Sequence, residues 1–385
     1  MTNPKILSTQ FSNVIIQRDT VLDFTVQLGI FEYSLCYMRT DTLLLPNGES
    51  YGPEWDIFLS NNTGTKRKNI TKWEYTDYEP LWSPNGDYIA FWREKPASVG
   101  MDRDLYLYNT YKDTLIGLLP SDTSNTVPTV WTHDSKDIIF YNTSHINGKS
   151  GYFIVNVDGN NCRKLKYPVS YLYHDDYNTI FSVTQSSGGT SVYHSNLDGS
   201  VLDSIVDLTH FVKTQSGGVS IHDYDPNANE LLLGFDDPST TLPNMFAKYN
   251  ITEKRLDTVI VSDSGWKYYN PKFSNDFKKI AFKEVNVADT VNYTNRISVL
   301  NLENHIKTVV VEFPHKNESG KYQFIDSSPV AFSPDDKYLA FSKGIYQQGT
   351  MAQWILYLYL VELETRQLTF IDIGKKPQWN PKKEH

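Results

Sequence analysis

One order of residues recurs along the chain: a proline, an aromatic residue, a polar turn and a short apolar strand. The clearest copies start at Glu79, Val127, Tyr269 and Ser328, and weaker copies start at Tyr167 and Val219. The aromatic residue of the apolar strand returns about every 50 residues, which is near the period of the four-stranded blades of β-propellers. These marker residues are Tyr37, Phe91, Phe140, Phe181, Phe235, Phe282 and Phe341. The repeat therefore predicts a propeller.

The remainder of each period also has the pattern of strands. Third strands are predicted at 54–61, 102–109, 151–159, 190–199, 244–252, 295–303 and 354–364, and fourth strands at 113–119, 162–167, 255–261 and 366–373. Turn pairs such as Asp158-Gly159 and Asn85-Gly86 lie between consecutive strands, as expected of hairpins. Each period therefore supplies the four antiparallel strands that one blade requires.

The two ends of the chain complement each other. Residues 376–381 repeat the first-strand signature with no second strand after them, whereas the N-terminal unit, 32–71, supplies only strands two to four. We therefore expect an all-β, seven-bladed β-propeller of four-stranded antiparallel blades, spanning residues 32–385 as one domain and closed by a C-terminal strand that completes the N-terminal blade. Residues 1–31 match no repeat and either add strands to the first blade or lie across the ring.

The repeat resembles a known family. The pattern from Pro80 to Phe91, and its echo from Pro329 to Phe341, look like the WD-like β-propeller repeat of TolB-type proteins. The third and fourth repeats depart from it, because Tyr171 and His222 stand where the Trp-Ser-Pro core is expected. The resemblance covers nearly the whole chain from about Glu32 and implies the propeller fold.

The same resemblance leaves the function open. The family includes periplasmic binding scaffolds, envelope lipoproteins, oligogalacturonate lyases and the propeller halves of serine peptidases. It implies a bacterial cell-envelope setting, periplasmic or surface-anchored, with the native signal or lipid anchor missing from this chain. A cytoplasmic location is the alternative.

Charge and hydropathy exclude several classes of protein. The chain has 36 basic and 45 acidic residues, a net charge of −9, which argues against nucleic-acid binding. No apolar run reaches the roughly 18 residues that a transmembrane helix needs. Aromatic residues make up 14% of the chain and favour strands over helices. We expect a monomer of the globular class.

No catalytic or metal-binding motif accompanies the repeats. The sequence contains no P-loop, HExxH or GxSxG pattern, and its nine histidines are scattered rather than paired at ligand spacing. His133 and His174 fall in turns, and His222, within an inner strand, is expected to be a core imidazole. We therefore predict no catalytic residue, no metal ligand and no cofactor.

The two cysteines, Cys36 and Cys162, form no CxxC or Cys/His arrangement. We expect both to be small buried hydrophobic residues. Because they belong to different and non-adjacent units, a disulfide between them is not expected.

Two further sets of residues recur with the repeat. The acidic turn residues could bind calcium, but capping of their own turns explains the recurrence without a ligand; they are Asp87, Asp134, Asp175, Asp225, Asp276 and Asp335. The recurrent aromatics are expected to pack between adjacent blades; they are Trp82, Trp131, Phe273, Phe332 and Trp379.

The candidate binding residues lie in connections between the fourth strand of one blade and the first strand of the next. These connections are unusually aromatic, with Trp73, Tyr75, Tyr78, Trp266, Tyr268, Tyr269, Tyr322 and Phe324. Tyr and Trp bury a large area at a small cost in entropy, so exposed aromatics among polar residues are typical of recognition surfaces. The alternative is that each ring folds back onto its own blade.

The sequence thus predicts a non-enzymatic binding scaffold that recognises a protein partner through this aromatic face. The alternative is a carbohydrate-binding or oligosaccharide lyase-like propeller acting at the axial mouth. The lyase reading requires converging His, Gln or carboxylate groups, and no such cluster is evident in the sequence.

Overall fold

The computed structural model describes fifteen segments of the chain: residues 33–39, 55–72, 76–95, 102–119, 126–142, 150–165, 171–174, 179–186, 189–197, 201–207, 218–236, 244–288, 294–326, 328–347 and 353–381. The regular structure in these segments consists of strands β1 to β29. The expected N-terminal segment, 1–31, lies outside the described residues. So do two of the candidate binding residues, Trp73 and Tyr75.

The strands form antiparallel sheets in which neighbours in sequence are neighbours in space. The first sheet contains β29 (Lys375–Trp379), β1 (Leu35–Arg39), β2 (Asp56–Ser60) and β3 (Arg67–Asn69). The second contains β4 (Thr76–Trp82), β5 (Tyr88–Lys95), β6 (Asp102–Asn109) and β7 (Thr114–Gly117). The third contains β8 (Thr126–Trp131), β9 (Asp137–Asn142), β10 (Gly151–Asn156) and β11 (Arg163–Lys164).

The remaining sheets continue the same order. The fourth contains β12 (Tyr171–His174), β13 (Thr179–Ser186), β14 (Gly189–Asn196) and β15 (Val201–Asp207). The fifth contains β16 (Gly218–Asp225), β17 (Glu230–Asp236), β18 (Met245–Asn250) and β19 (Arg255–Val261). The sixth contains β20 (Trp266–Phe273), β21 (Lys279–Asn286), β22 (Asn295–Asn301) and β23 (Lys307–Phe313). The seventh contains β24 (Gln323–Ile325), β25 (Ala331–Phe332), β26 (Tyr338–Gln347), β27 (Gln353–Glu362) and β28 (Leu368–Ile373).

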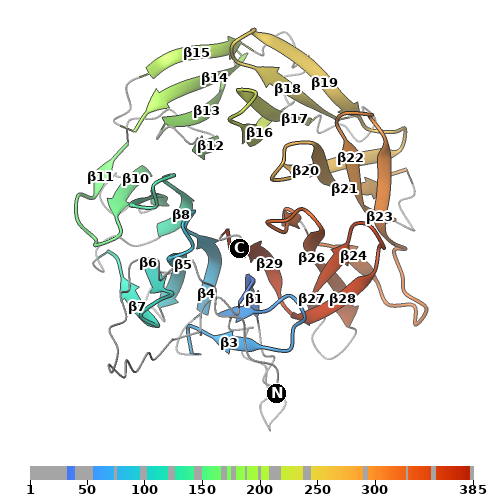
Figure 1. Ribbon diagram of the computed structural model, residues 1–385, viewed down its shortest axis with the longest axis horizontal. Helices are drawn as coiled ribbons and strands as arrows, with labels where there is room; N and C mark the ends of the chain where they lie inside the picture. The colour runs from blue at the N-terminus through green and yellow to red at the C-terminus, as the bar shows by residue number, and fades with distance from the viewer. Residues whose placement is uncertain are drawn as a thin grey trace, which may run out of the picture.

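The sheets surround a central axis, with strands such as β4, β8, β16, β20 and β29 nearest to it (Figure 1). The prediction of an all-β propeller with four-stranded antiparallel blades is confirmed, and six of the described sheets have four strands. The seventh has five, because both β24 and β25 pair with β26. Pro329 lies in the gap between these two short strands, and a proline cannot donate a backbone hydrogen bond to a ladder.

Two faces of the ring are defined by the direction of the inner strands. We call the end where inner strands begin, as at Thr76, Trp266 and Lys375, the upper face. The lower face is the end where they finish and turn into the second strand, as at Trp82 and Phe273.

The marker aromatics lie on the second strand of each sheet and form the core. Each of them is at most 8% exposed: Tyr37, Phe91, Phe140, Phe181, Phe235, Phe282 and Phe341. Strands buried on both sides, between two neighbouring sheets, explain why these segments read as continuous apolar runs rather than as alternating ones.

The recurrent inner-strand aromatics pack between blades, as predicted. Trp131 lies in a cluster with Ala90, Leu105 and Leu107 of the preceding sheet, and its indole N–H donates to the carbonyl oxygen of Leu81 at 3.0 Å. Trp82, Phe273, Phe332 and Trp379 occupy the equivalent clusters at other sheet boundaries. These rings therefore belong to the core.

The indole hydrogen bond of Trp131 gives a test of this packing. Trp92 is also buried, but its indole nitrogen has no hydrogen-bond partner among the described residues. Replacing either tryptophan by phenylalanine removes similar ring area, but only Trp131→Phe breaks a hydrogen bond. We expect Trp131→Phe to be more destabilising than Trp92→Phe by about 1 kcal/mol in urea unfolding. Equal losses in the two variants would contradict a role for the inter-blade hydrogen bond.

The acidic turn residues cap their own turns, as predicted. Asp134, Asp276 and Asp335 each accept the backbone N–H two residues later, and Asp225 accepts those of Asn227 and Ala228. In the second sheet this position is held by Asn85, which accepts the N–H of Asp87 at 3.1 Å, so Asp87 itself is shifted from the repeat position. Asp175 lies outside the described residues.

The cysteine prediction is correct for one residue of the two. Cys36 is buried on β1, whereas Cys162 is exposed in the connection between β10 and β11. Both are free thiols. Cys162 is exposed because β11 is only two residues long, so the chain around it has little sheet to pack against.

The C-terminal strand β29 contacts three sheets. It pairs with β1, with Trp379 opposite Leu35 and Gln378 opposite Cys36. The side-chain oxygen of Gln378 accepts the N–H of Trp82 in the second sheet, and the indole N–H of Trp379 donates to Ala331 in the seventh. The two ends of the chain are thereby joined in one sheet.

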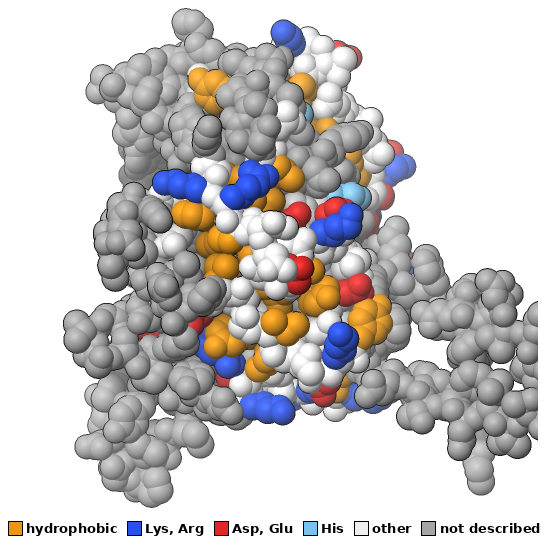
Figure 2. Space-filling view, turned by 90° about the vertical axis from the view of Figure 1, so that its left-hand side faces the viewer, with side chains coloured by type: hydrophobic (Ala, Val, Ile, Leu, Met, Phe, Trp, Pro, Cys, Tyr) orange, Lys and Arg blue, Asp and Glu red, His pale blue; other side chains and the backbone are white. Residues whose placement is uncertain are grey.

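The outer side of the ring is mixed in character. On the side shown in Figure 2, hydrophobic, charged and uncharged polar side chains are interspersed over the described residues. Within those residues, no helix is long and apolar enough to cross a membrane.

Candidate functional site

Five of the eight predicted aromatic residues lie on strands rather than in loops. Tyr78 belongs to β4, Trp266, Tyr268 and Tyr269 belong to β20, and Phe324 belongs to β24. The strand β20 begins at Trp266, because pairing with β21 already starts there, opposite Asn286. Alternate residues of a strand point to opposite sides, so the sheet geometry decides which of these rings reach solvent.

Three of the rings are accessible on the upper face. Tyr269 is 38% exposed and Tyr322 is 40% exposed, and Trp266 is half-buried. The guanidinium carbon of Arg296 lies 4.1 Å from the centre of the Trp266 ring. The ammonium of Lys316 lies 4.7 Å from the centre of the Tyr322 ring. Such cation–π contacts hold the rings in place and reduce the entropy that binding would cost.

Two other predicted residues fold back onto their own sheets. Tyr78 stacks on Trp92 with ring centres 4.0 Å apart, and these residues are register partners on β4 and β5. Phe324 lies against its partner Gly344, where an added Cβ would come within 2.2 Å of the ring. For these two positions the structure favours the packing alternative.

Tyr268 requires a correction, because it is fully buried and lies on no surface. It follows Trp266 and precedes Tyr269 on β20, so its ring points into the boundary with the fifth sheet, where it meets Phe246 and Phe282. Its backbone N–H donates to the side chain of Asn244 at 2.9 Å. Tyr268 is therefore a structural residue.

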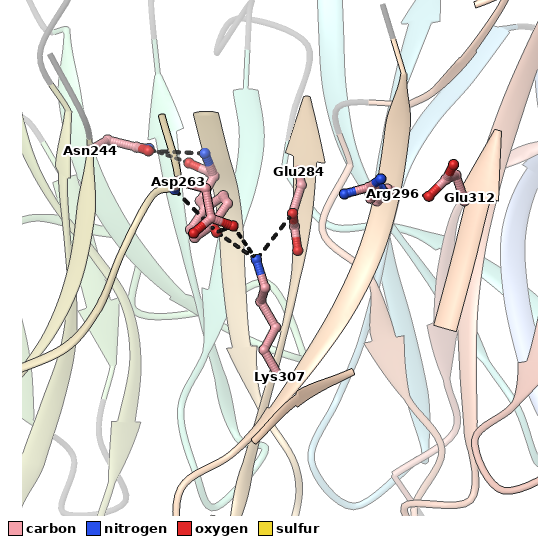
Figure 3. A network of polar contacts seen from close by, with 7 residues as sticks. Asn244, Asp263, Glu284, Arg296, Lys307 and Glu312 are labelled. Atoms are coloured by element: carbon pink, nitrogen blue, oxygen red, sulfur yellow. Dashed lines mark hydrogen bonds and ion pairs between the residues drawn. The ribbon is translucent and has the colours of Figure 1, made fainter. Parts of the chain in front are cut away.

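Asp263, Glu284 and Lys307 point toward one another in a polar network (Figure 3), which also includes the Tyr268 hydroxyl. The ammonium of Lys307 donates to Asp263 at 2.6 Å and to the Tyr268 hydroxyl at 2.7 Å, and it lies 3.5 Å from Glu284. Glu284 is fully buried, and its Oε1 has no hydrogen-bond partner among the described residues. Lys307 thus supplies the positive charge that balances a buried carboxylate.

The pKa values in this network follow from these contacts. Burial alone disfavours the charged form of Lys307, but the hydrogen bonds to Asp263 and Tyr268 outweigh it and raise the pKa of the ammonium. The hydrogen bond from Lys307 holds the pKa of Asp263 below its usual value, and burial raises the pKa of Tyr268. Lys307 therefore stays charged at neutral pH.

Loss of the Lys307 charge is expected to be costly. In Lys307→Met, the buried carboxylate of Glu284 loses its counter-charge, and we expect a destabilisation of about 2 kcal/mol in urea unfolding. Lys278→Met is the matched control, because Lys278 pairs with Glu303 and both side chains are more than half exposed. The control is expected to change stability by less than about 0.5 kcal/mol. Similar effects in the two variants would show that burial of Glu284 does not matter.

A cavity of about 730 Å³ lies on the axis of the ring. It extends from the middle of the inner strands to the turns that follow them on the lower face. Its polar lining comes from six of the sheets or the turns beside them: Glu79, Thr129, His222, Asn270, Lys272, Asn275, Ser328, Lys376 and Gln378. Its apolar lining is rich in proline, with Pro80, Pro128, Pro271, Pro329, Pro334, Pro377 and Pro381. Mixed linings of this size are typical of small-molecule sites.

Strained backbone forms part of the cavity wall. Glu79, Asn270 and Lys376 have φ values of 55°, 52° and 54°, and each of them immediately precedes a proline. A positive φ is unfavourable for residues other than glycine, and a residue that precedes proline is further restricted to extended conformations. At Glu79 and Asn270 the strand pairing shifts register by one bulge. Strain of this kind persists only where the surroundings impose it.

Charged residues in the cavity are paired across sheet boundaries. Lys376 on β29 forms an ion pair with Glu79 on β4. The ammonium of Lys272 lies 2.9 Å from the carboxylate of Asp223, which is almost fully buried and also accepts the N–H of Phe273. The sequence repeat located the prolines of this cavity, but not its charged pairs, which come from residues that are far apart in the chain.

Among the described residues that line this cavity, His222 is the one histidine. It is on β16, hydrogen-bonded to Ser220 at 2.8 Å, and faces Gly234, where an added Cβ would come within 2.4 Å of the ring. Burial lowers the pKa of His222 to about 4. His222 is thus a hydrogen-bonded imidazole, as expected, but it is partly buried on the cavity wall rather than in the core. In the described part of the chain, no three His, Cys, Asp or Glu side chains are grouped as metal ligands would be.

Comparisons with known proteins reveal the fold. No family model matches the sequence, and no curated protein matches it either. Among solved structures, the chain resembles TolB from Acinetobacter baumannii at 13% identity and a TM-score of 0.49, over 91% of this chain and 67% of that one.

Two enzymes are also among the similar structures. One is oligogalacturonate lyase from Vibrio parahaemolyticus, at 9% identity and a TM-score of 0.54, over 89% of this chain and 86% of that one. The other is a puromycin-hydrolyzing peptidase from Mycobacterium tuberculosis, at 8% identity and a TM-score of 0.59, over 90% of this chain and 54% of that one. The chain spans about half the length of that peptidase. At these identities the likeness concerns the propeller fold alone.

Proposed function

We propose that this chain is a non-enzymatic binding scaffold that recognises a protein partner on its upper face. The observation that carries this function is the set of Trp266, Tyr269 and Tyr322, whose rings are accessible on a rigid sheet framework. Two of these rings are held by cations at 4.1 and 4.7 Å. Preorganised aromatic side chains are the residues that dominate binding energy in protein interfaces.

We also propose that the seven sheets act as the blades of one ring, which β29 fastens by pairing with β1. In this arrangement one monomer carries the complete upper face. The TolB-type repeats favour an extracytoplasmic setting.

A capture experiment tests the partner site. Purified protein is crosslinked to an extract of the cells that produce it, and captured proteins are identified for the wild type and for Trp266→Ala/Tyr269→Ala/Tyr322→Ala. We expect the variant to lose at least tenfold in capture of a partner bound by the wild type. The matched control is Tyr111→Ala, because Tyr111 is 45% exposed but lies in a turn on the lower face.

The outcomes separate the proposal from its rival. Equal capture by the triple variant and the wild type would overturn the aromatic site. A second candidate function, carbohydrate binding, is favoured by the axial cavity of about 730 Å³ with its mixed lining. Binding of an acidic oligosaccharide by the wild type, without capture of any protein, would favour that function instead.

A further inference from the structure

Three lysines from three sheets surround one short segment on the upper face. Lys283 of β21 donates its ammonium hydrogen bond to the carbonyl oxygen of Ile325. Lys343 of β26 is the register partner of the same Ile325. Lys375, the first residue of β29, is close enough to the adjacent Asp326 to interact with its charge, as Lys283 does. We call Lys283, Lys343 and Lys375 the lysine cluster.

The lysine cluster has little counter-charge. None of the three ammonium groups forms an ion pair with a carboxylate of the described residues. Asp326 influences Lys283 and Lys375, and Glu79, which is itself paired with Lys376, adds a smaller influence on Lys375. Instead, the ammonium of Lys343 lies 3.8 Å from the centre of the Phe313 ring, and that of Lys375 lies 4.2 Å from the centre of the Trp55 ring. Three lysines without ion pairs around one segment are unusual in a chain with a net charge of −9.

Burial of the lysine cluster has an energetic consequence. All three side chains are partly buried, and this burial lowers the pKa of Lys283 to about 8 and also lowers the pKa values of Lys343 and Lys375. A partly desolvated ammonium without a carboxylate partner costs free energy, and an arriving anion would recover it.

The lysine cluster adjoins the aromatic residues of the proposed partner site. Tyr269 is the register partner of Lys283, so the two side chains lie on the same side of the sixth sheet. Tyr322 precedes β24, the strand that ends at Ile325, and its ring lies beneath the ammonium of a fourth lysine, Lys316. Cations and accessible aromatic rings therefore share one area of the upper face.

We infer that the lysine cluster receives the carboxylates of an acidic segment of the protein partner, while Tyr269 and Tyr322 pack against the apolar residues beside it. This inference rests on the proposed function, because it names the chemistry of the partner at that site. Charge complementarity favours this occupant, because the three partly exposed lysines form no ion pair and belong to a protein of net negative charge.

A peptide-binding experiment tests the lysine cluster without the natural partner. A fluorescent hexaglutamate peptide is titrated with the wild type and with Lys343→Gln/Lys375→Gln, which leaves the structural hydrogen bond of Lys283 intact. We expect the double variant to bind the peptide about tenfold more weakly, and wild-type affinity to fall as salt is added. A hexaglutamine peptide is expected not to bind.

The matched control is Lys112→Gln/Lys136→Gln. Both of these lysines are exposed in turns on the lower face, so the control removes the same net charge at a distance from the lysine cluster. Thermal unfolding of all proteins checks that each is folded. Equal peptide affinity in the wild type and the cluster variant would overturn the inference, as would equal weakening in the control variant.

Two further arms separate this inference from the proposed function and from its rival. If hexaglutamate binds at the cluster but the aromatic triple variant still captures the partner, the aromatic site fails and the anion site stands. If the aromatic variant loses the partner but hexaglutamate does not bind, the aromatic site stands and the inference about the lysine cluster fails. Trigalacturonate is added as a competitor. If it binds and hexaglutamate does not, the ligand of the lysine cluster is an acidic carbohydrate, and the inference of an acidic protein segment is overturned.

Discussion

A chain that ends at Gly374 is expected to lose more than about 5 kcal/mol of unfolding free energy relative to the full chain. Such a chain lacks β29, so β1 loses its neighbour in the first sheet and becomes an unpaired edge. The truncation also removes Trp379 from the hydrophobic cluster that it shares with Leu35, Leu358 and Ile371. Urea unfolding followed by circular dichroism measures the loss.

The control for this truncation is a chain that ends at Pro381. It retains β29 and all of its described contacts, and we expect its stability to match that of the full chain. If the chain ending at Gly374 does not fold, Trp379→Ala provides a milder version of the test, with an expected loss of about 3 kcal/mol. Unchanged stability in both the truncation and Trp379→Ala would mean that β29 does not fasten the ring.

Acidification from pH 7 to pH 4 is expected to cost the wild type about 3 kcal/mol more than it costs His222→Gln. His222 lies partly buried on the wall of the axial cavity, and desolvation lowers its pKa from 6.5 in the unfolded chain to about 4 in the folded one. Between these two values the unfolded chain binds a proton that the folded protein does not. The contribution of His222 is therefore complete above pH 6.5 and is lost as the pH falls toward 4.

Urea midpoints at pH 7, 5.5 and 4 measure this difference. The charges near His222 act in opposite directions, because Asp223 raises its pKa and Lys272 lowers it, so the desolvation dominates. His133→Gln is the matched control, since His133 is exposed in a turn on the lower face. Parallel pH profiles for the wild type and His222→Gln would show that His222 is solvated in the folded protein.

The repeat predicted most of the local structure. In a segment such as Pro80 to Phe91, the local residues specify the local structure. The turn residues Asn85 and Gly86 reverse the chain, and the apolar Phe91 lies on a strand that is buried on both sides. Local sequence is sufficient here because turn chemistry and hydrophobic burial act within a few residues. The packing of Trp131 between blades was also predictable from the repeat, because the other clear repeats have an aromatic residue at the equivalent position.

The candidate site was predicted only in part. Tyr268 and Tyr269 are adjacent, and one is fully buried while the other is 38% exposed. The prediction that both residues lie in a loop implied that both rings are exposed. On the strand β20, adjacent side chains instead point to opposite sides of the sheet. Composition locates an aromatic segment, but the start of the strand determines which ring reaches solvent.

The sequence by itself thus determined the propeller architecture, the core aromatics and the capped turns of this protein, because each of these depends on one repeat and its immediate neighbours. Only the tertiary structure decided what gathers around the axis. Lys283, Lys343 and Lys375 belong to three different sheets, and so do Glu79, Lys272 and Thr129 of the axial cavity. Residues this far apart in the chain meet because the sheets are arranged around one axis (Figure 1), and that geometry is not encoded in any single repeat.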